Sequence, residues 1–351
     1  MRLRSRFQST CIKALVAQSS GPPIYRMGTF RSMPITDPNA SQPSEVAAAV
    51  IEQAGQILIS KRADSKHQGG KWEFPGGKLE AGETARKALS RELEEELGIV
   101  ITDARPLIQI LHHYPDKSVR LSVFKVTGFS GTPKGLEGQP ILWVNPSQLN
   151  DLEFPPANFP IIQAAQLPEI CAITPPSWNT PAQLIESLKK NLPTHELAVL
   201  RLPEYSASRY TEVATVAAEI ANSAGMRLLL TSSAEEVVNL KAGGLHLNSK
   251  RLMSLESRPI IKDYLVSAAC HSAEQLKQAE KLQLDFVFLS PVKKTNSHPD
   301  ASPIGWSEFS ALAGRCQIPV YALGGVELEN LDQSFRCGAQ GIAGISRIWQ
   351  K

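Results

Sequence analysis

Eight short apolar segments recur through the second half of the chain, and most of them are separated by helical stretches. The segments are EICAIT, LAVLRL, RLLLT, GLHL, LVSAAC, FVFLSP, PVYAL and GIAGI. Strands that alternate with helices form βαβ units and a parallel sheet, and eight such strands predict a closed (β/α)₈ barrel of the TIM type. The segment after GLHL is too short for a full helix. An open doubly wound sheet is therefore the alternative fold.

The first half of the chain predicts a different α/β domain with a mixed sheet. VAAAVIE and QILISKR predict a hairpin, and a helix is expected from Glu83 to Leu97, closed by Gly98. Further strands are predicted in LIQILHHY, VRLSVFKVTGF and ILWV, and a short final helix in PPANFPIIQAAQ. A chain of 351 residues is long enough for two domains, which we place at residues 46–167 and 168–351.

The composition and net charge of the chain limit which kinds of binding partner we expect. The net charge of +3 is too small for this length to indicate a nucleic-acid polymer as partner, and no run of about 18 apolar residues predicts a membrane span. The five cysteines are scattered without a CxxC pair, which fits reduced thiols better than a disulfide framework or a zinc site. We therefore expect a cytoplasmic protein of bacterial type.

Residues 1–45 are predicted to be a disordered extension. The first 36 residues hold five arginines and one lysine, and the first acidic residue is Asp37, which is also the composition of an organelle transit peptide. The apolar part is short and leads into the polar segment TDPNASQPS, which favours a disordered tail. A later start, at Met27 or Met33, is a further alternative.

Six glutamates crowd the stretch GGKLEAGETARKALSRELEEELGI, residues 76–99. On a helix Glu92, Glu95 and Glu96 share one face, whereas Glu94 points elsewhere. Like charges at this spacing destabilise an isolated helix, so the three carboxylates favour a bound cation. Oxygen ligands suit Mg²⁺ or Mn²⁺, and Mg²⁺ usually binds substrate phosphates as well. The alternative is a solvated acidic helix whose charge is offset by neighbouring basic residues.

The spacing of this stretch matches Gly-x5-Glu-x7-Arg-Glu-U-x-Glu-Glu-x-Gly-U, where U is a bulky aliphatic residue, at every fixed position. The matching residues are Gly77, Glu83, Arg91, Glu92, Leu93, Glu95, Glu96, Gly98 and Ile99. The stretch is thereby identified as a Nudix box. The resemblance implies a loop–helix–loop that binds divalent metal and hydrolyses a nucleoside diphosphate linked to another group.

The same resemblance assigns roles within the box. The metal ligands would be three carboxylates and one backbone carbonyl, from Glu92, Glu95, Glu96 and Gly76. Arg91 would pair with Glu83 and hold the helix. Water would attack phosphorus, and either Glu92 or Glu137 would activate it, with two or more metal ions bridging the phosphate oxygens.

The flanking motifs WEFPGGK, LEGQP and FPPAN resemble the MutT branch of that family, the hydrolases that remove 8-oxo-dGTP from the nucleotide pool. In that branch a glutamate at the position of Glu137 is a further metal ligand or base. The FPPAN motif supplies Phe154 and the base-recognising Asn158. Arg62 and His67 lie where MutT relatives also carry Arg and His, and are expected to contact the phosphates or the base. A polar loop residue is the alternative for His67.

The chemistry of Asn158 explains how such a site would select its base. Oxidised guanine presents an N7–H donor beside its O6 acceptor, and a carboxamide pairs with both groups. Normal guanine has an acceptor at N7, which would leave a buried polar group unpaired and cost orders of magnitude in discrimination. The alternative is that Asn158 is only the N-cap of the terminal helix.

In the second half, GLHL, DFVFLSPVKKT, PVYALGGV and CGAQGIAGIS resemble the thiamine-phosphate synthase and TenI group of TIM barrels. The resemblance covers roughly residues 169–349 and implies that glycine-exposed backbone N–H groups near the seventh and eighth strands bind phosphate. The candidate residues are Lys294, Thr295, Gly324, Gly325 and Ser346. The ligand would be a phosphorylated thiazole or pyrimidine.

The chain also departs from the synthase pattern. Synthases carry acids after the third and fourth strands that hold Mg²⁺ against a pyrophosphate, but LLLTSS and GLHLNSK offer none. Without them the synthase reaction lacks its metal, so we do not expect full synthase activity. TenI-like barrels use a histidine as acid or base, and no spacing distinguishes His246, His271 and His298.

Three hypotheses follow for the whole chain. The leading one is an Mg²⁺-dependent 8-oxo-dGTP diphosphatase that protects DNA replication from mutation, fused to a TenI-like barrel of degenerate or unassigned activity. The second is a Nudix hydrolase of thiamine-related diphosphates. The third is a non-enzymatic sensor of a nucleotide or thiamine phosphate.

Overall fold

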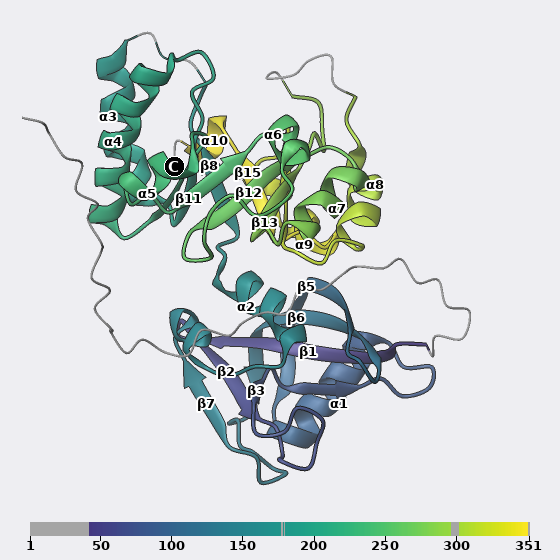
Figure 1. Cartoon of the computed structure of the whole chain (residues 1–351). Helices are drawn as coiled ribbons and strands as arrows, with labels where there is room; N and C mark the ends of the chain where they lie inside the picture. The colour runs from purple at the N-terminus through teal and green to yellow at the C-terminus, as the bar shows by residue number, and fades with distance from the viewer. Residues whose placement is uncertain (1–41, 177, 179, 296–301, 350–351) are drawn as a thin grey trace, which may run out of the picture. The chain divides into compact units, whose positions relative to one another are not determined.

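The computed structural model describes residues 42–176, 178, 180–295 and 302–349 (Figure 1). The predicted disordered extension lies almost entirely outside these residues; within them the first strand already begins at Ser44. Among the described residues, no helix combines the length and the apolar character that crossing a membrane requires.

The N-terminal domain is built on a seven-stranded mixed sheet, in the order β3-β2-β1-β6-β5, with β4 beside β1 and β7 beside β2. β1 and β6 run parallel, and the other neighbours are antiparallel. The strands are β1 (Ser44–Gln53), β2 (Gln56–Lys61), β3 (Trp72–Glu73), β4 (Gly76–Lys78), β5 (Val100–His113), β6 (Ser118–Ser130) and β7 (Ile141–Val144). The predicted β1–β2 hairpin is confirmed.

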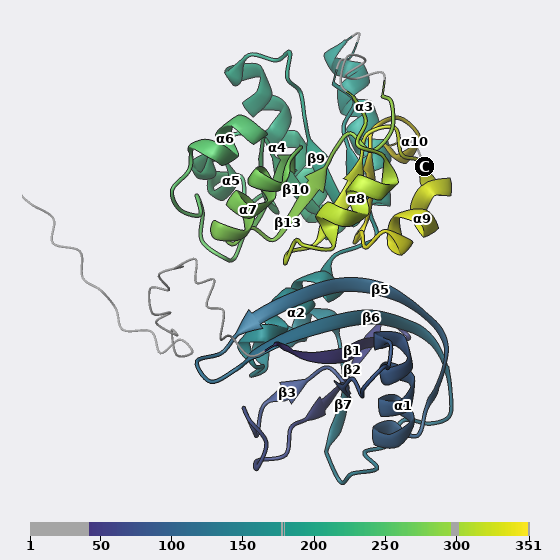
Figure 2. The same ribbon diagram turned by 90° about the vertical axis from the view of Figure 1, so that its right-hand side faces the viewer.

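Two helices cover opposite faces of this sheet, α1 (Ala85–Leu97) and α2 (Phe159–Gln166) (Figures 1 and 2). Alternate residues of β1 explain the arrangement, because successive side chains of a strand point to opposite faces. Ala49 and Ile51 pack with the leucines of α1, whereas Ala48 and Val50 pack in the cluster that contains the α2 isoleucines. The predicted α/β domain with a mixed sheet is confirmed.

Helix α1 begins two residues later than predicted. Thr84 is its N-cap, and the threonine hydroxyl accepts a hydrogen bond from the Lys87 N–H. Glu83 therefore lies in the preceding loop. Gly98 ends the helix in the left-handed conformation at φ 68°, as predicted.

The C-terminal domain is a closed barrel of eight parallel strands, in the order β10-β11-β12-β13-β14-β15-β8-β9. Its strands are β8 (Ile170–Ile173), β9 (Leu197–Leu200), β10 (Arg227–Leu230), β11 (Gly244–Leu247), β12 (Leu265–Cys270), β13 (Phe286–Leu289), β14 (Val320–Leu323) and β15 (Gly341–Gly344). Each lies in one of the eight predicted segments. Pairing of β15 with β8 closes the ring, so the open doubly wound sheet is wrong.

A helix follows each of these strands, and the helices lie outside the barrel (Figure 2). They are α3 (Pro181–Asn191), α4 (Ala207–Ala224), α5 (Ala234–Asn239), α6 (Ser249–Ser254), α7 (Ala273–Lys281), α8 (Gly305–Ala313), α9 (Leu331–Arg336) and α10 (Ser346–Trp349). Short 3₁₀ turns are η1 (Pro146–Asp151), η2 (Pro156–Asn158), η3 (Leu192–Thr194) and η4 (Leu328–Asn330). The segment after β11 forms only the six-residue α6, as its length predicted.

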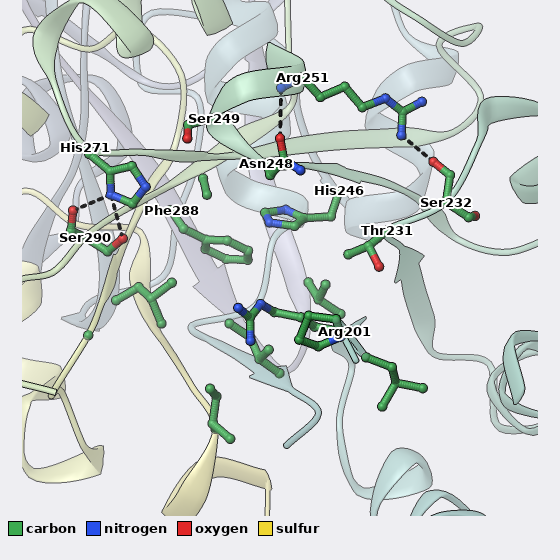
Figure 3. A pocket seen from close by; sticks show the side chains of 18 of the residues that line it. Arg201, Thr231, Ser232, His246, Asn248, Ser249, Arg251, His271, Phe288 and Ser290 are labelled. Carbon is green, nitrogen blue, oxygen red and sulfur yellow. Dashed lines mark hydrogen bonds between the residues drawn. The ribbon is translucent and has the colours of Figure 1, made fainter. Parts of the chain in front are cut away.

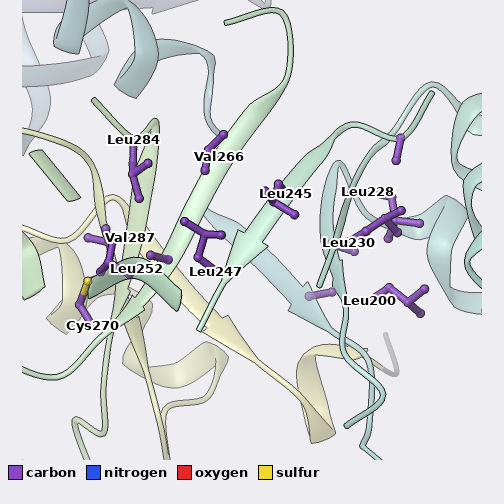
Figure 4. Packing of buried hydrophobic residues seen from close by; sticks show 14 of the residues in the cluster. Leu200, Leu228, Leu230, Leu245, Leu247, Leu252, Val266, Cys270, Leu284 and Val287 are labelled. Atoms are coloured by element: carbon purple, nitrogen blue, oxygen red, sulfur yellow. The ribbon is translucent and has the colours of Figure 1, made fainter. Parts of the chain in front are cut away.

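Strand alternation also places His246 inside the barrel. Its neighbours Leu245 and Leu247 belong to the packed layer beneath the helices (Figure 4). The side chain between them must point to the other face, where its ring lies 5.1 Å from that of Phe288. His246 is only 9% exposed.

Candidate active site

Arg91 joins the loop before α1 to the acidic face of the helix. Its guanidinium donates to both carboxylate oxygens of Glu83, at 3.0 and 3.2 Å, and to the Lys78 carbonyl at 3.1 Å. The predicted pair of Arg91 and Glu83 is therefore present. The hydrogen bond from Arg91, followed by one from the Glu80 backbone N–H, holds the pKa of Glu83 below its usual value.

The same guanidinium gathers two of the predicted metal-binding carboxylates. Arg91 lies 2.9 Å from Glu92 Oε1 and 3.2 Å from Glu95 Oε2. The Glu92 side chain is 16% exposed and that of Glu95 58%. Arg91 thus offsets part of the repulsion on this helix face, while Glu95 keeps access to solvent.

The glycines of WEFPGG let the backbone approach these carboxylates. A Cβ on Gly77 would lie 2.1 Å from the carboxylate carbon of Glu92. Gly76 has a φ of +141°, and a Cβ there would lie 2.1 Å from the Ala47 carbonyl oxygen. The Gly76 N–H donates to Glu96 Oε2 at 3.4 Å. Glycine at position 77 leaves room for the Glu92 carboxylate of the helix, and glycine at position 76 leaves room for the backbone of β1.

Gly77→Ala is expected to displace the Glu92 carboxylate and lower hydrolysis by about tenfold or more, since small displacements of catalytic groups are costly. The clash is with the end of a flexible side chain, so the fold should survive. Gly76→Ala is the comparison: it meets backbone and a positive φ, and should cost more than about 1 kcal/mol of stability. Thermal unfolding and steady-state rates of both variants test this; equal losses of stability would contradict it.

Glu96 lies among other acids on the buried side of the site. Burial, together with the nearby charges of Glu73, Glu92 and Glu137, raises the pKa of its carboxyl to about 7. Sequence reasoning missed Glu73, although it stands in the quoted motif WEFPGG. Burial raises the Glu73 pKa as well, against the lowering effect of its ion pair with Arg62.

The loop that carries Glu137 is fastened to the end of α1. The Leu136 N–H and the Gln139 side chain both donate to the Glu96 carbonyl, at 2.9 and 3.0 Å. The Gln139 oxygen in turn accepts from the Glu137 N–H at 2.9 Å. These bonds hold Glu137 near Glu96, while its own carboxylate stays half exposed and 3.8 Å from Lys66 Nζ.

Asn158 stands at the N-cap position of α2, but its side chain makes no capping hydrogen bond. Asn158 is half-buried. It is thus the N-cap residue by position, as the alternative predicted, but its carboxamide is not used as a cap. Phe154 stacks on Phe74 with ring centroids 5.5 Å apart. Tyr114, which sequence reasoning missed, has its hydroxyl beside the backbone of Ala157, the residue before Asn158.

Arg62 and His67 lie close to each other, and His67 contacts Tyr114. Arg62 pairs with Glu73 and donates to the His67 carbonyl at 3.1 Å. The His67 ring contacts Tyr114 edge-on at 4.9 Å, and its Nε2 is buried without a partner among the described residues. The Arg62 guanidinium therefore pairs with Glu73 in this structure. Contact of Arg62 or His67 with substrate stays a prediction.

In the barrel, a large pocket opens at the carboxyl ends of the strands, and part of the predicted phosphate-binding set reaches it. Gly324 and Thr295 line the pocket, whereas Lys294 and Gly325 are not among its lining residues. Gly325 has a φ of +67°, and a Cβ there would lie 2.3 Å from the Lys294 carbonyl oxygen. The Ser346 side chain lies outside the described residues, as does His298.

Two family models match the chain: NUDIX domain over residues 46–164, and thiamine monophosphate synthase over residues 170–348. Over 119 residues the chain is 40% identical to an 8-oxo-dGTP diphosphatase of Escherichia coli strain K12, a match of 34% of this chain and 92% of that protein. The chain belongs to the Nudix and thiamine monophosphate synthase families. Both resemblances predicted from the motifs are thereby confirmed, with a MutT-like Nudix hydrolase domain first.

Other relatives differ in what their names say. A CTP pyrophosphohydrolase of Escherichia coli strain K12 is 38% identical over 120 residues, which are 34% of this chain and 89% of that protein. A putative thiamine-phosphate synthase 2 of Aquifex aeolicus is 38% identical over 119 residues, 34% of this chain and only 64% of that protein.

Solved structures are similar to each half. MutT from Aliivibrio salmonicida and Vibrio cholerae matches at 37% identity with a TM-score of 0.31, over 35% of this chain and 97% of that one. Thiamine phosphate pyrophosphorylase from Pyrococcus furiosus matches at 19% identity with a TM-score of 0.42, over 51% of this chain and 85% of that one.

The donor set of the Nudix site fits a divalent cation. No three acidic, histidine or cysteine side chains of the described residues form a ready metal cluster, and Arg91 contacts both Glu92 and Glu95. Yet Glu96 is desolvated among neighbouring carboxylates, and a hard cation would relieve that repulsion. Glu92, Glu95, Glu96 and Glu137, with the Gly76 carbonyl, stay the predicted ligands.

In the barrel, His246 is a buried titratable side chain (Figure 3). Its Nδ1 lies 2.8 Å from Ser267 Oγ. Burial, with a smaller effect of the Arg201 charge, lowers its pKa from 6.5 to about 3. Between these values the unfolded chain binds a proton that the folded barrel does not. The contribution of His246 to the free energy of unfolding is therefore fully present above pH 6.5. It falls as the pH decreases below that value, by up to about 1.4 kcal/mol per pH unit.

Urea unfolding at pH 7 and pH 5 tests this prediction. The loss between the two values should be smaller in His246→Gln than in the native chain, because glutamine does not titrate. Equal losses in the two proteins would show that His246 does not cause the acid sensitivity.

Proposed function

We propose that the Nudix domain hydrolyses 8-oxo-dGTP to 8-oxo-dGMP and pyrophosphate and so sanitises the nucleotide pool. The observation that carries the proposal is the half-buried carboxamide of Asn158, which no helix cap consumes. It presents a donor and an acceptor together, the pair that oxidised guanine requires. The 40% identity to a relative named as an 8-oxo-dGTP diphosphatase supports the same substrate.

The roles of the side chains follow from their contacts. A bound divalent ion supplies charge neutralisation at the phosphates. Glu92 or Glu137 accepts the proton of the attacking water, as a new P–O bond forms and the bond to pyrophosphate breaks. Arg91 orients Glu92 and Glu95 from its anchor on Glu83. Asn158 recognises the base, and Phe154 with Phe74 packs beside it.

A second candidate substrate is a thiamine-related diphosphate. The observation that favours it is the fused barrel, because the thiamine monophosphate synthase family model matches residues 170–348. CTP is the further comparison, because one 38% identical relative is named as a CTP pyrophosphohydrolase.

The experiment is a comparison of kcat/KM for the full chain with Mg²⁺ and four substrates: 8-oxo-dGTP, dGTP, CTP and thiamine diphosphate. We expect 8-oxo-dGTP to exceed dGTP by about 100-fold or more, the scale set by an unpaired buried polar group. Preference for thiamine diphosphate or CTP would replace the proposal. Equal turnover of dGTP and 8-oxo-dGTP would exclude base recognition by Asn158, and no turnover of any substrate would favour a sensor.

A further inference from the structure

Among the described residues, three basic side chains form ion pairs with acidic residues of the Nudix site, and two of the three are firmly held. Arg62 pairs with Glu73, and its side chain is only 24% exposed. Arg91 donates to both carboxylate oxygens of Glu83 at 3.0 and 3.2 Å. These two guanidinium groups therefore have fixed partners, whereas the third basic side chain, Lys66, is held differently.

Lys66 is held only weakly by its partner. Its Nζ lies 3.8 Å from Glu137 Oε2, which is longer than the roughly 3 Å of a hydrogen bond. The two side chains are 53% and 54% exposed. An exposed ion pair with this separation contributes little to stability, so another cation can replace Lys66 at Glu137.

The backbone of the loop that carries Lys66 is nevertheless well defined. At the base of the loop, the Arg62 N–H donates to the Lys71 carbonyl at 2.9 Å. Within the loop, the Lys66 N–H donates to the Ala63 carbonyl at 3.0 Å, and the Lys66 carbonyl accepts the Gly69 N–H at 2.9 Å. The backbone of Lys66 is therefore fixed, whereas its ammonium is carried on a flexible four-carbon chain.

The ammonium of Lys66 lies within electrostatic reach of the acidic cluster. Burial raises the pKa of Glu73, and the charges of Arg62 and then of Lys66 lower it. Burial, followed by charges that include those of Glu73 and Glu137, raises the pKa of Glu96 to about 7. Mg²⁺ binds through carboxylates and substrate phosphates together. Phosphates bound in this way would come close to Lys66.

We propose that Lys66 is an exchangeable cation of the Nudix site, which pairs with Glu137 in the absence of a metal ion and binds the phosphates of the nucleotide when a divalent ion occupies Glu137. A divalent ion on Glu137 repels the ammonium. The released ammonium lies next to the negative charge of the phosphates and can donate hydrogen bonds to their oxygens. The inference rests on the proposed hydrolysis of a nucleoside triphosphate, but not on which base the site prefers.

Isothermal titration of the full chain with Mn²⁺, without nucleotide, tests the exchange at Glu137. Lys66→Gln should bind Mn²⁺ about twofold to fivefold more tightly than the native chain, because no ammonium competes for the carboxylate. This gain should disappear when Lys66→Gln is combined with Glu137→Gln, since the effects of two interacting residues are not additive.

Steady-state hydrolysis at saturating Mg²⁺ tests the contact with phosphate. Lys66→Gln should raise KM by about tenfold, the value of a charged hydrogen bond, for whichever nucleoside triphosphate the native chain hydrolyses, with little change in kcat. Lys66→Arg keeps the charge and should retain most of the native KM. Lys71→Gln is the matched control, because it removes the same charge from the same loop, but Lys71 donates to Gln68 at 2.8 Å. Its Mn²⁺ affinity and KM should match those of the native chain.

Tighter Mn²⁺ binding together with weaker nucleotide binding is the result that a merely structural role of Lys66 would not give. Weaker binding of both, or native values of both, in Lys66→Gln would overturn the proposal, and tighter Mn²⁺ binding with a native KM would overturn the contact with phosphate. Failure of the native chain to hydrolyse any nucleoside triphosphate would overturn the proposed function instead. The Mn²⁺ titration needs no substrate and would still decide the exchange at Glu137. Thermal midpoints of the variants show that they fold.

Discussion

Glu96→Gln is expected to lower kcat for nucleotide hydrolysis by about 1000-fold or more, because it removes an anionic ligand from the group that holds the metal. Glu96 lies among Glu73, Glu92 and Glu137, and burial with these charges raises its pKa to about 7. The repulsion costs stability when no cation is bound. We therefore expect the variant to unfold at a higher temperature in EDTA than the native chain, although its activity is lost.

Glu94→Gln is the matched control, since Glu94 lies on the same helix and is exposed. Its rate should stay within about twofold of the native rate, as for a substitution away from the site. Glu95→Gln is expected to abolish hydrolysis as well, but without the gain in stability, because Glu95 is 58% exposed and paired with Arg91. Pyrophosphate release at saturating Mg²⁺ measures the hydrolysis rate of all three variants. An active Glu96→Gln protein would exclude Glu96 as a metal ligand.

Periodicity in the sequence was enough to predict the barrel. All eight of its strands lie in the predicted segments, because each is a short buried run between helices. The start of α1 could not be placed as well, since a capping threonine competes with the acidic residues before it. Thr84 accepts the Lys87 N–H, which leaves Glu83 outside the helix and free to meet Arg91.

The fixed spacing of the Nudix box located the acidic face, but the residues that complete the site come from distant segments. Glu73 and Tyr114 carry no spacing signal, and only folding brings Glu73 near Glu96 and Tyr114 to the backbone of Ala157. The barrel pocket depends even more on residues that are distant in the sequence. Arg201 and Arg251 are 50 positions apart, and their common cavity depends on the closure of the strand ring.

Asn158→Ala is expected to remove most of the preference for 8-oxo-dGTP over dGTP, lowering the ratio of their kcat/KM values by about 100-fold. The loss should come from the oxidised substrate, because the alanine no longer pairs with its N7–H and O6. Turnover of dGTP should change little. The substitution removes no capping bond, so the thermal midpoint should also change little.

Asn150→Ala is the comparison for this variant, since Asn150 is exposed and its side chain donates to the Gln166 side chain at 3.4 Å. Its substrate preference should match that of the native chain. Tyr114→Phe gives an intermediate test: it removes the hydroxyl beside the Ala157 backbone but leaves the Asn158 amide in place. If Asn158 acts through its amide, the preference should fall partly in Tyr114→Phe and almost completely in Asn158→Ala. A fall of both substrates together in Asn158→Ala would mean that the residue shapes the loop and does not recognise the base.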